Sequence, residues 1–268
     1  RNRAAAEAII AGLPPSPESK YEFIECDVLL MKNVHALAAD LLKRLPKINF
    51  LVHCAGSLRF FGSRKETEEG IDDMFAIRYY NRFALTKDLL PLLQNATANK
   101  EAASVLCVLG AGLAPEIDLE DLGLKKKYAV MKAGSQTVAY NDLMVAVSTM
   151  LASSRGACLR CSNLQEFARQ NPDIAFTHVW PGFVFNGTMF GPGKLTTFLS
   201  FFFRPLLWAF ATPPEENAEY MLFALLSGEK GMYRRGRKGE DIGMKKFPQA
   251  KDAQRILYEH SVAETASK

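Results

Sequence analysis

A phenol and an ammonium group four residues apart are the first feature of this sequence that suggests chemistry. Tyr128 and Lys132 have the spacing Tyr-x-x-x-Lys, which places both side chains on one face of a helix. Such a pair can pass a proton to or from a carbonyl oxygen while hydride moves, because a nearby ammonium favours the phenolate of a tyrosine. The same spacing also arises often by chance, so it needs support from the rest of the chain.

Two turns follow apolar runs that are typical of buried strands. Residues 50–52 lead into 53–56 (His-Cys-Ala-Gly), and residues 176–180 lead into 181–184 (Pro-Gly-Phe-Val). Small residues and glycine at such points allow a nucleotide to approach the backbone at the carboxyl edge of a sheet. Taken alone, each turn is explained equally well as a tight structural turn.

The apolar periodicity predicts strands and helices that alternate along the chain. Strands are predicted at 21–28, 48–54, 103–109 and 174–180, with a short last strand near Met232. Helices are predicted at 34–45, 66–93, 128–151 and 215–227, the second of them broken by Pro91. This order predicts an α/β fold with a doubly wound parallel sheet and helices on both faces. Residues 153–163 fit no element and are either a surface insertion or foreign sequence.

Composition narrows the class of protein. The 268 residues, 48% of them hydrophobic, can bury a large core, and the net charge of +4 is too small to indicate a nucleic-acid partner. The basic run 234–238 is predicted to be a solvated surface loop. Five scattered cysteines indicate a reducing, cytoplasmic setting, and Cys158 and Cys161 lack the partners that would predict a metal site.

The chain opens on a helical pattern rather than on a signal peptide. Its most apolar stretch, 195–211, is interrupted by Arg204 and Pro205 and is too short to span a bilayer. Contact with a membrane surface remains an alternative for it.

The ordered set of motifs resembles the short-chain dehydrogenase/reductase family. Residues 53–56 look like its Asn-Asn-Ala-Gly, Tyr128 and Lys132 like its catalytic pair, and Pro181-Gly182 like its Pro-Gly motif. The resemblance covers residues 1 to about 239 and is strongest to fungal members with a Tyr-Tyr pair, here 79–80. It implies a single Rossmann-like, NAD(P)-binding domain over 1–268, whose first strand and glycine-rich loop would lie before residue 1.

The resemblance also implies roles for individual residues. Tyr128 would be the general acid/base, and Lys132 would lower its pKa and bind the nicotinamide ribose. Residues expected to line the cofactor are Asp27, Val28, Cys54, Ala55, Gly56, Pro181, Gly182 and Val184, together with Tyr128 and Lys132. Arg1 and Arg3 stand where arginine often meets a 2′-phosphate, which mildly favours NADP over NAD. Residues 188–212 would form a substrate lid, indicating an apolar small-molecule substrate, a membrane-facing lid or packing in a homo-oligomer.

Three departures from the family pattern keep other functions open. No Gly-x-x-x-Gly-x-Gly occurs, and the catalytic serine position falls near Leu109 or Gly110, neither of which has a hydroxyl. Arg78 stands at the family's asparagine, with Asn81 one turn further on, and Asn186 replaces a threonine. The leading hypothesis is an NAD(P)-dependent oxidoreductase of carbonyl or alcohol substrates. The alternatives are a catalytically silent protein that binds a ligand or partner, and a truncated gene product. His178, inside a predicted strand, is expected to be a hydrogen-bonded core residue.

Overall fold

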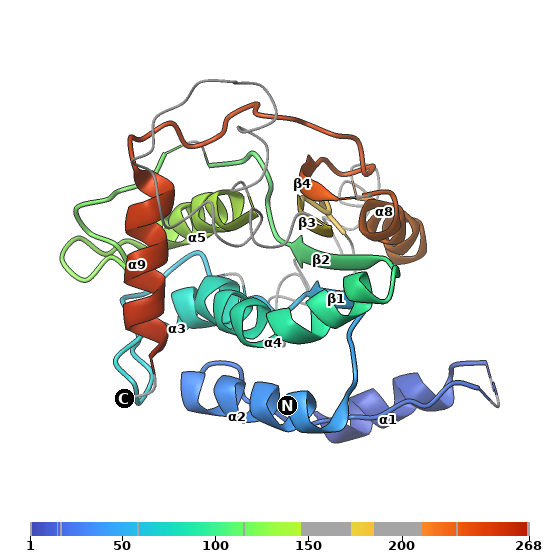
Figure 1. Ribbon diagram of the computed structural model, residues 1–268. Helices are drawn as coiled ribbons and strands as arrows, with labels where there is room; N and C mark the ends of the chain where they lie inside the picture. Colours follow the sequence, from blue (N-terminus) through green and yellow to red (C-terminus); the bar gives the residue numbers. More distant parts are fainter. Residues whose placement is uncertain are drawn as a thin grey trace, which may run out of the picture.

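A single parallel sheet forms the centre of the computed structural model, which describes residues 2–14, 16, 18–57, 59–114, 116–145, 173–184, 211–228 and 230–266. The described strands are β1 (Phe50–His53), β2 (Ala103–Val108), β3 (Ile174–Val179) and β4 (Gly231–Arg235). They pair in the order β1-β2-β3-β4, all parallel (Figure 1). The predicted parallel sheet is therefore confirmed.

Helices cover both faces of this sheet. The described helices are α1 (Arg3–Ala11), α2 (Met31–Arg44), α3 (Asp73–Phe75), the π-helical η1 (Ala76–Tyr80), α4 (Asn81–Ala98), α5 (Val130–Val145), α8 (Pro214–Leu226) and α9 (Ala253–Thr265). Val105 of β2 packs with Leu93 of α4 and Val145 of α5, whereas the next residue, Leu106, packs with Leu225 of α8. Because alternate side chains of a strand point to opposite faces, α8 lies on the face opposite α4 and α5.

Residues 73–98 form one continuous helical segment made of α3, η1 and α4. The segment begins where Asp72 Oδ1 accepts hydrogen bonds from the backbone N–H groups of Met74 (3.1 Å) and Phe75 (3.4 Å). Its π-helical turn continues directly into α4. The prediction that Pro91 breaks this helix is wrong, because α4 continues to Ala98 with Pro91 inside it. Burial of the neighbouring Leu92 and Leu93 offsets the hydrogen bond that proline removes.

The strand predicted at 21–28 is also wrong. These residues have no strand assignment, and in the described part of the chain no segment pairs with the outer edge of β1. On that edge strand, Phe50 and Val52 are 44% and 45% exposed. A strand needs a hydrogen-bonded neighbour, so the local pattern alone was not enough to form one.

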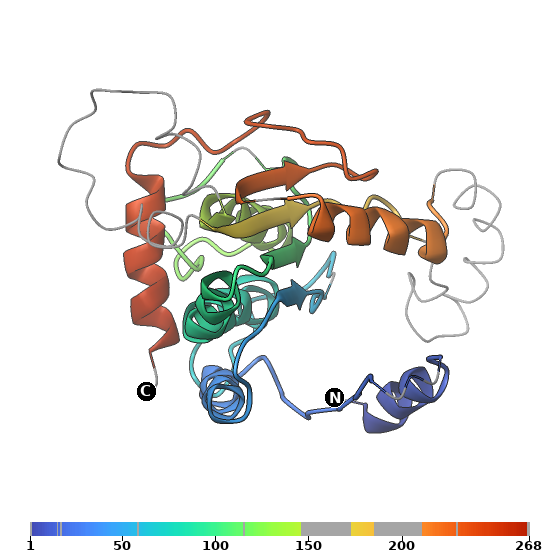
Figure 2. The ribbon, with the colours of Figure 1, turned by 45° about the vertical axis from the view of Figure 1, so that its right-hand side comes forward.

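The C-terminal helix α9 lies against α5 (Figure 2), and its side chains also contact the tyrosine pair of η1. The Tyr79 hydroxyl lies 2.8 Å from Ser261 Oγ, and the Tyr80 hydroxyl lies 2.7 Å from His260 Nε2. Burial raises the pKa of both phenols well above the usual value. These tyrosines are therefore structural residues that hold the end of the chain against the core.

Several predicted features lie outside the described residues. They are Arg1, the insertion at 153–163, Cys158, Cys161, Asn186 and all but the last two residues of the lid at 188–212.

Candidate active site

The two turns predicted to contact a cofactor lie at one edge of the sheet. Cys54, Ala55 and Gly56 directly follow β1 and are exposed, and the Pro181–Gly182 turn follows β3. Because the strands are parallel, their carboxyl ends share one edge, where ligands of open α/β sheets bind. Gly182 has a φ of +73°, and a Cβ there would approach Arg237 Cβ to 3.1 Å, so the turn requires glycine.

Arg82 of α4 joins the first of these turns to β2. Its Nη2 donates to the carbonyl oxygens of Ala55 (2.7 Å) and Val108 (3.1 Å). The side chain is fully buried, and burial lowers its pKa. A guanidinium fixed by two carbonyl groups thus sets the spacing between the ends of β1 and β2.

Arg78, which the resemblance places at the family's asparagine, lies one helical turn before Arg82. Its Nη1 donates to the carbonyl oxygen of Ser57 (3.0 Å), and its Nε donates to Thr137 Oγ1 of α5 (2.9 Å). Burial lowers the pKa of Arg78 to about 10. The arginine therefore connects the exposed turn after β1 with the helix that follows Tyr128.

Tyr128 is positioned by a loop built around Asp121. The Asp121 carboxylate accepts hydrogen bonds from the backbone N–H groups of Lys126 (3.0 Å) and Lys127 (2.8 Å), which directly precede Tyr128. Burial acts to raise the pKa of Asp121, but these hydrogen bonds bring it below the usual value.

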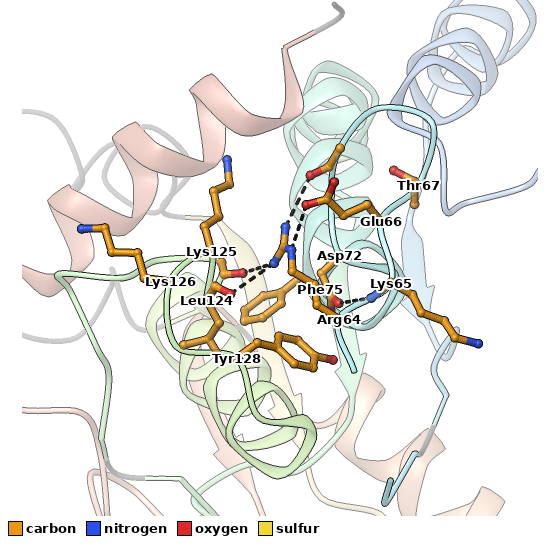
Figure 3. Close-up of polar contacts among 12 residues, drawn as sticks. Arg64, Lys65, Glu66, Thr67, Asp72, Phe75, Leu124, Lys125, Lys126 and Tyr128 are labelled. Carbon is orange, nitrogen blue, oxygen red and sulfur yellow. Dashed lines mark hydrogen bonds and ion pairs between the residues drawn. The ribbon is translucent and has the colours of Figure 1, made fainter. Parts of the chain in front are cut away.

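Arg64 fixes the same loop from the other side. Figure 3 shows its guanidinium between the turn that carries Glu66 and the loop that carries Leu124. Arg64 Nη1 donates to the carbonyl oxygen of Gly123 (2.7 Å), and Nε donates to Glu66 Oε1 (2.9 Å). The position of Tyr128 thus depends on a residue far away in the sequence.

The Tyr128 hydroxyl contacts an arginine that the sequence did not indicate. Arg59 Nη2 donates to Tyr128 Oη at 3.0 Å. Burial raises the pKa of Tyr128, and the Asp72 carboxylate raises it further, whereas Arg59 acts to lower it. The net shift is upward, so the lowered pKa expected for this phenol is not found.

Lys132 has a different partner from the one expected. Its Nζ lies 2.7 Å from Asp118 Oδ2 in a half-exposed ion pair. Tyr128 lies two residues before α5 begins at Val130, so the prediction that it shares a helix face with Lys132 is wrong. The cause is the loop closed by Asp121 and Arg64, which extends through the tyrosine.

Asp27 and Val28, predicted at the adenine, lie just before α2. Asp27 Oδ1 accepts a hydrogen bond from the backbone N–H of Leu29 (3.2 Å), and Val28 packs against the core. The helix itself is capped by Glu69, whose carboxylate accepts from the N–H groups of Met31 (2.6 Å) and Lys32 (2.9 Å). A carboxylate from outside the helix thus replaces a local capping residue.

A buried charge network lies beneath the same edge and was not predicted as a unit. Asp142 of α5 accepts from His178 Nδ1 (2.7 Å) and from Nε (2.9 Å) and Nη2 (2.8 Å) of Arg234. All three side chains are fully buried. Burial acts to raise the pKa of Asp142, but His178 and Arg234 bring it below the usual value.

Two sequence predictions are decided by this network. The expectation that His178 is a hydrogen-bonded core residue is confirmed. The solvated loop predicted at 234–238 is wrong for its first two arginines, since Arg234 and Arg235 are 1% and 7% exposed. For Arg234, pairing with Asp142, 92 positions away, made this burial possible.

The network also holds the backbone at Gly110 and Gly112, where the resemblance predicts the catalytic serine near Leu109 or Gly110. Gly110 N–H donates to His178 Nε2 (3.2 Å), and Gly112 N–H donates to Asp142 Oδ2 (3.1 Å). Gly110 must be the donor, so the ring proton of His178 lies on Nδ1. No hydroxyl at Leu109 or Gly110 is available to polarise a substrate.

Two kinds of feature are absent from the described part of the chain. Among those residues, no three His, Cys, Asp or Glu side chains gather as metal ligands. Within the same residues, no helix combines the length and the apolar character needed to cross a membrane.

Comparison with known proteins agrees with the fold and the motifs. A family profile described as enoyl-(acyl carrier protein) reductase matches residues 2–114. Oxidoreductase AN1596 of Emericella nidulans is 31% identical over 230 residues, which cover 85% of this chain and 62% of that protein. Short-chain dehydrogenase/reductase SAT2 of Stachybotrys chartarum is 29% identical over 123 residues, 42% of this chain and 34% of that protein.

A solved structure of NADPH-bound carbonyl reductase from chicken fatty liver has the same fold. Its TM-score is 0.51 at 16% identity, with 82% of this chain and 76% of that chain covered. The chain spans less than two thirds of the length of the two curated relatives. The parallel sheet, the turns at its carboxyl edge and these matches agree with the predicted resemblance to the short-chain dehydrogenase/reductase family.

Proposed function

We propose that this chain provides the reaction centre of an NAD(P)-dependent oxidoreductase that interconverts a carbonyl group and an alcohol. One observation carries the proposal: Arg59, three residues after the exposed turn at Cys54–Gly56, donates a hydrogen bond to the Tyr128 hydroxyl. The contact brings a phenol with acid/base capacity to the turn expected to face the cofactor.

The described residues fit the nicotinamide half of the cofactor. The turn after β1 is exposed, its backbone is fixed from within by Arg78 and Arg82, and the Lys132 side chain is 35% exposed near the start of α5. Among the described segments, none offers the glycine-rich backbone that would hold a pyrophosphate. We therefore assign the residues of this chain to the nicotinamide ribose, with Lys132 as its donor.

The protein's own groups would act on the substrate oxygen. When bound, the reduced nicotinamide supplies a hydride to the carbonyl carbon. The Tyr128 hydroxyl then gives its proton to the carbonyl oxygen, which completes the alcohol and leaves a phenolate to be reprotonated from solvent. In alcohol oxidation the phenolate takes the proton instead.

The substrate is proposed to be apolar. Large apolar side chains are exposed near this edge, including Phe61 (88%), Met131 (63%) and Phe183 (63%). Met131 is the neighbour of Lys132, and Phe183 follows the Pro-Gly turn. Contact with a membrane surface or a second subunit through 195–211 remains a proposal that the described residues do not address.

NADP is the proposed cofactor, by a small margin over NAD. The NADPH-bound carbonyl reductase that shares the fold supports this choice. Arg3, the predicted phosphate contact within the described chain, stacks over Phe23 at 5.1 Å and pairs with Glu7 at 3.7 Å. Its exposed position leaves it accessible to a phosphate.

Binding and turnover measurements test the proposal together. We expect NADPH, titrated by fluorescence against the full-length protein that contains this chain, to bind more tightly than NADH. Carbonyl reduction should fall on the order of 10²–10⁴-fold in Tyr128→Phe, with cofactor affinity unchanged. Reduction that survives this substitution would refute the assigned chemistry.

The specific rival is a protein that binds a ligand without turning it over. The raised pKa of Tyr128, the ion pair of Lys132 with Asp118 and the missing hydroxyl at Leu109 or Gly110 favour it. Cofactor binding without any turnover over a panel of ketones and alcohols would support this second function.

A further inference from the structure

Arg59 places a permanent positive charge at the oxygen of Tyr128. Its Nη2 lies 3.0 Å from Tyr128 Oη and 3.0 Å from Asp73 Oδ1. Asp73 is the first residue of α3, and its carboxylate keeps the guanidinium in place from the helical side. The planar guanidinium of Arg59 thus presents a cation and a fixed fork of donors directly at the phenol oxygen.

The remaining nitrogens of Arg59 make its environment unusual. Arg59 Nε and Nη1 are buried and have no hydrogen-bond partner among the described residues. A guanidinium with two unpaired donors beside a phenol has hydrogen-bonding capacity left for a ligand oxygen.

The lysine expected to act on Tyr128 is occupied elsewhere. Lys132 Nζ is bound to Asp118 at 2.7 Å, and this pairing lowers the pKa of Asp118. Both cations have a carboxylate partner, but it is Arg59 that also contacts the phenol oxygen directly.

We propose that Arg59 is a catalytic residue that holds the Tyr128 oxygen and stabilises the negative charge left there when the proton departs. The inference rests on the proposed acid/base function of Tyr128. It assigns to Arg59 the electrostatic task that the family resemblance assigns to Lys132, and leaves Lys132 to bind the cofactor ribose.

The charged groups around the phenol define what a titration should show. Asp72, which begins the helical segment, acts on Tyr128 against the phenolate, and Arg59 acts for it. Asp73 faces Arg59, and the Arg64 charge acts on Asp72. Removing Arg59 takes away the cation that acts for the phenolate and leaves the opposing effect of Asp72, so the phenol should become harder to ionise.

The decisive experiment titrates Tyr128 itself, without substrate or cofactor. A difluorinated tyrosine placed at position 128 brings the phenol pKa towards neutral pH, and fluorine NMR then follows its ionisation alone. In Arg59→Met we expect the midpoint to rise by about one pH unit or more. Arg59→Lys, which keeps the charge, should restore most of the shift.

Lys132→Met is the matched control, because it removes a cation from the neighbouring helix. Its midpoint should stay close to that of the parent. Circular dichroism verifies that each variant is folded, and Arg59→Gln is titrated in place of the methionine variant if that one does not fold. An unchanged midpoint without the Arg59 charge, or an equal rise in Lys132→Met, would overturn the proposal.

A kinetic measurement separates this inference from the proposed function. If alcohol oxidation requires the phenolate, its rate should begin to rise at a higher pH in Arg59→Met, while the rate on the alkaline plateau is recovered. A shift in the titration without any loss of activity in Tyr128→Phe would retain the electrostatic contact and reject its catalytic use. An unshifted titration together with a fully inactive Tyr128→Phe would retain the catalytic role of Tyr128 and reject the electrostatic role of Arg59.

Discussion

Replacing Asp142 with asparagine should reveal how much of the stability of this fold depends on one buried carboxylate. The carboxylate accepts four hydrogen bonds, two from Arg234 and one each from His178 and Gly112. An asparagine is isosteric, but its amide group would turn a donor towards other donors. It would also leave the Arg234 guanidinium buried without a counter-charge.

The expected cost follows from this geometry. Removing one partner of a buried ion pair costs about 3–5 kcal/mol, because the remaining charge stays desolvated. With a urea dependence of roughly 2–3 kcal/mol per molar, the unfolding midpoint should fall by roughly 1–2.5 M. Equilibrium urea unfolding followed by far-ultraviolet circular dichroism measures this shift directly.

Asp173→Asn provides a matched control. Asp173 pairs with Lys230 at 2.9 Å, but its side chain is 60% exposed. Such surface pairs contribute about 0–1 kcal/mol, so the same chemical change should scarcely move the midpoint. If both variants lower the urea midpoint equally, then the burial of Asp142 and its four hydrogen-bond donors do not determine how much it contributes to stability.

Three further predictions concern acid stability, catalysis and the loop that carries Tyr128. Burial lowers the pKa of His53 from 6.5 to about 3, so its neutral form is kept in the folded state while the unfolded chain takes up a proton. As the pH drops from 6.5 to about 3, the free energy of unfolding should fall by about 1.4 kcal/mol per pH unit because of His53. His53→Gln should reduce this dependence on pH, measured by urea unfolding across the same pH range. In Tyr128→Phe, turnover should fall on the order of 10²–10⁴-fold while NADPH affinity is kept, measured by steady-state kinetics and fluorescence. Arg64→Met removes the charge-assisted hydrogen bond to Gly123, and we expect it to cost about 1.5–3 kcal/mol in urea unfolding. A stable Arg64→Met protein would show that the loop before α5 is held by Asp121 alone.

The elements buried on both faces were predictable from the sequence. The strands at 103–108 and 174–179 are mostly apolar and almost entirely buried, because both faces of a parallel strand lie against helices. Helices such as α2 and α8 were found from their apolar spacing and have nearly the predicted bounds. In these segments the burial of each residue follows the spacing of apolar residues within the segment itself. A single sequence is enough to show that spacing.

The predictions failed where the outcome depended on distant residues. Residues 21–28 have the residue pattern of a strand, but a strand forms only beside a neighbouring strand that shares its hydrogen bonds. Pro91 indicated a helix end, but the packing of its buried neighbours continued the helix. Arg234 was predicted to be solvated, but in the folded chain its guanidinium donates to the Asp142 carboxylate of α5 and to the carbonyl oxygens of Gly243 and Lys245.

The candidate site likewise has features that the sequence predicted and contacts that only the folded structure revealed. The sequence by itself determined the family motifs: the small turn residues at 54–56, the Pro-Gly turn and the phenol of Tyr128, since these depend on residue type and order. Only the tertiary structure decided what surrounds them. Arg59 and Lys132 are both cations that lie close in the sequence to predicted site residues. In the folded chain, however, Lys132 pairs with Asp118, and Arg59 contacts the phenol of Tyr128. Hydrogen bonds between side chains 69 positions apart leave no periodic trace in a sequence, because their geometry exists only after the backbone has closed around them.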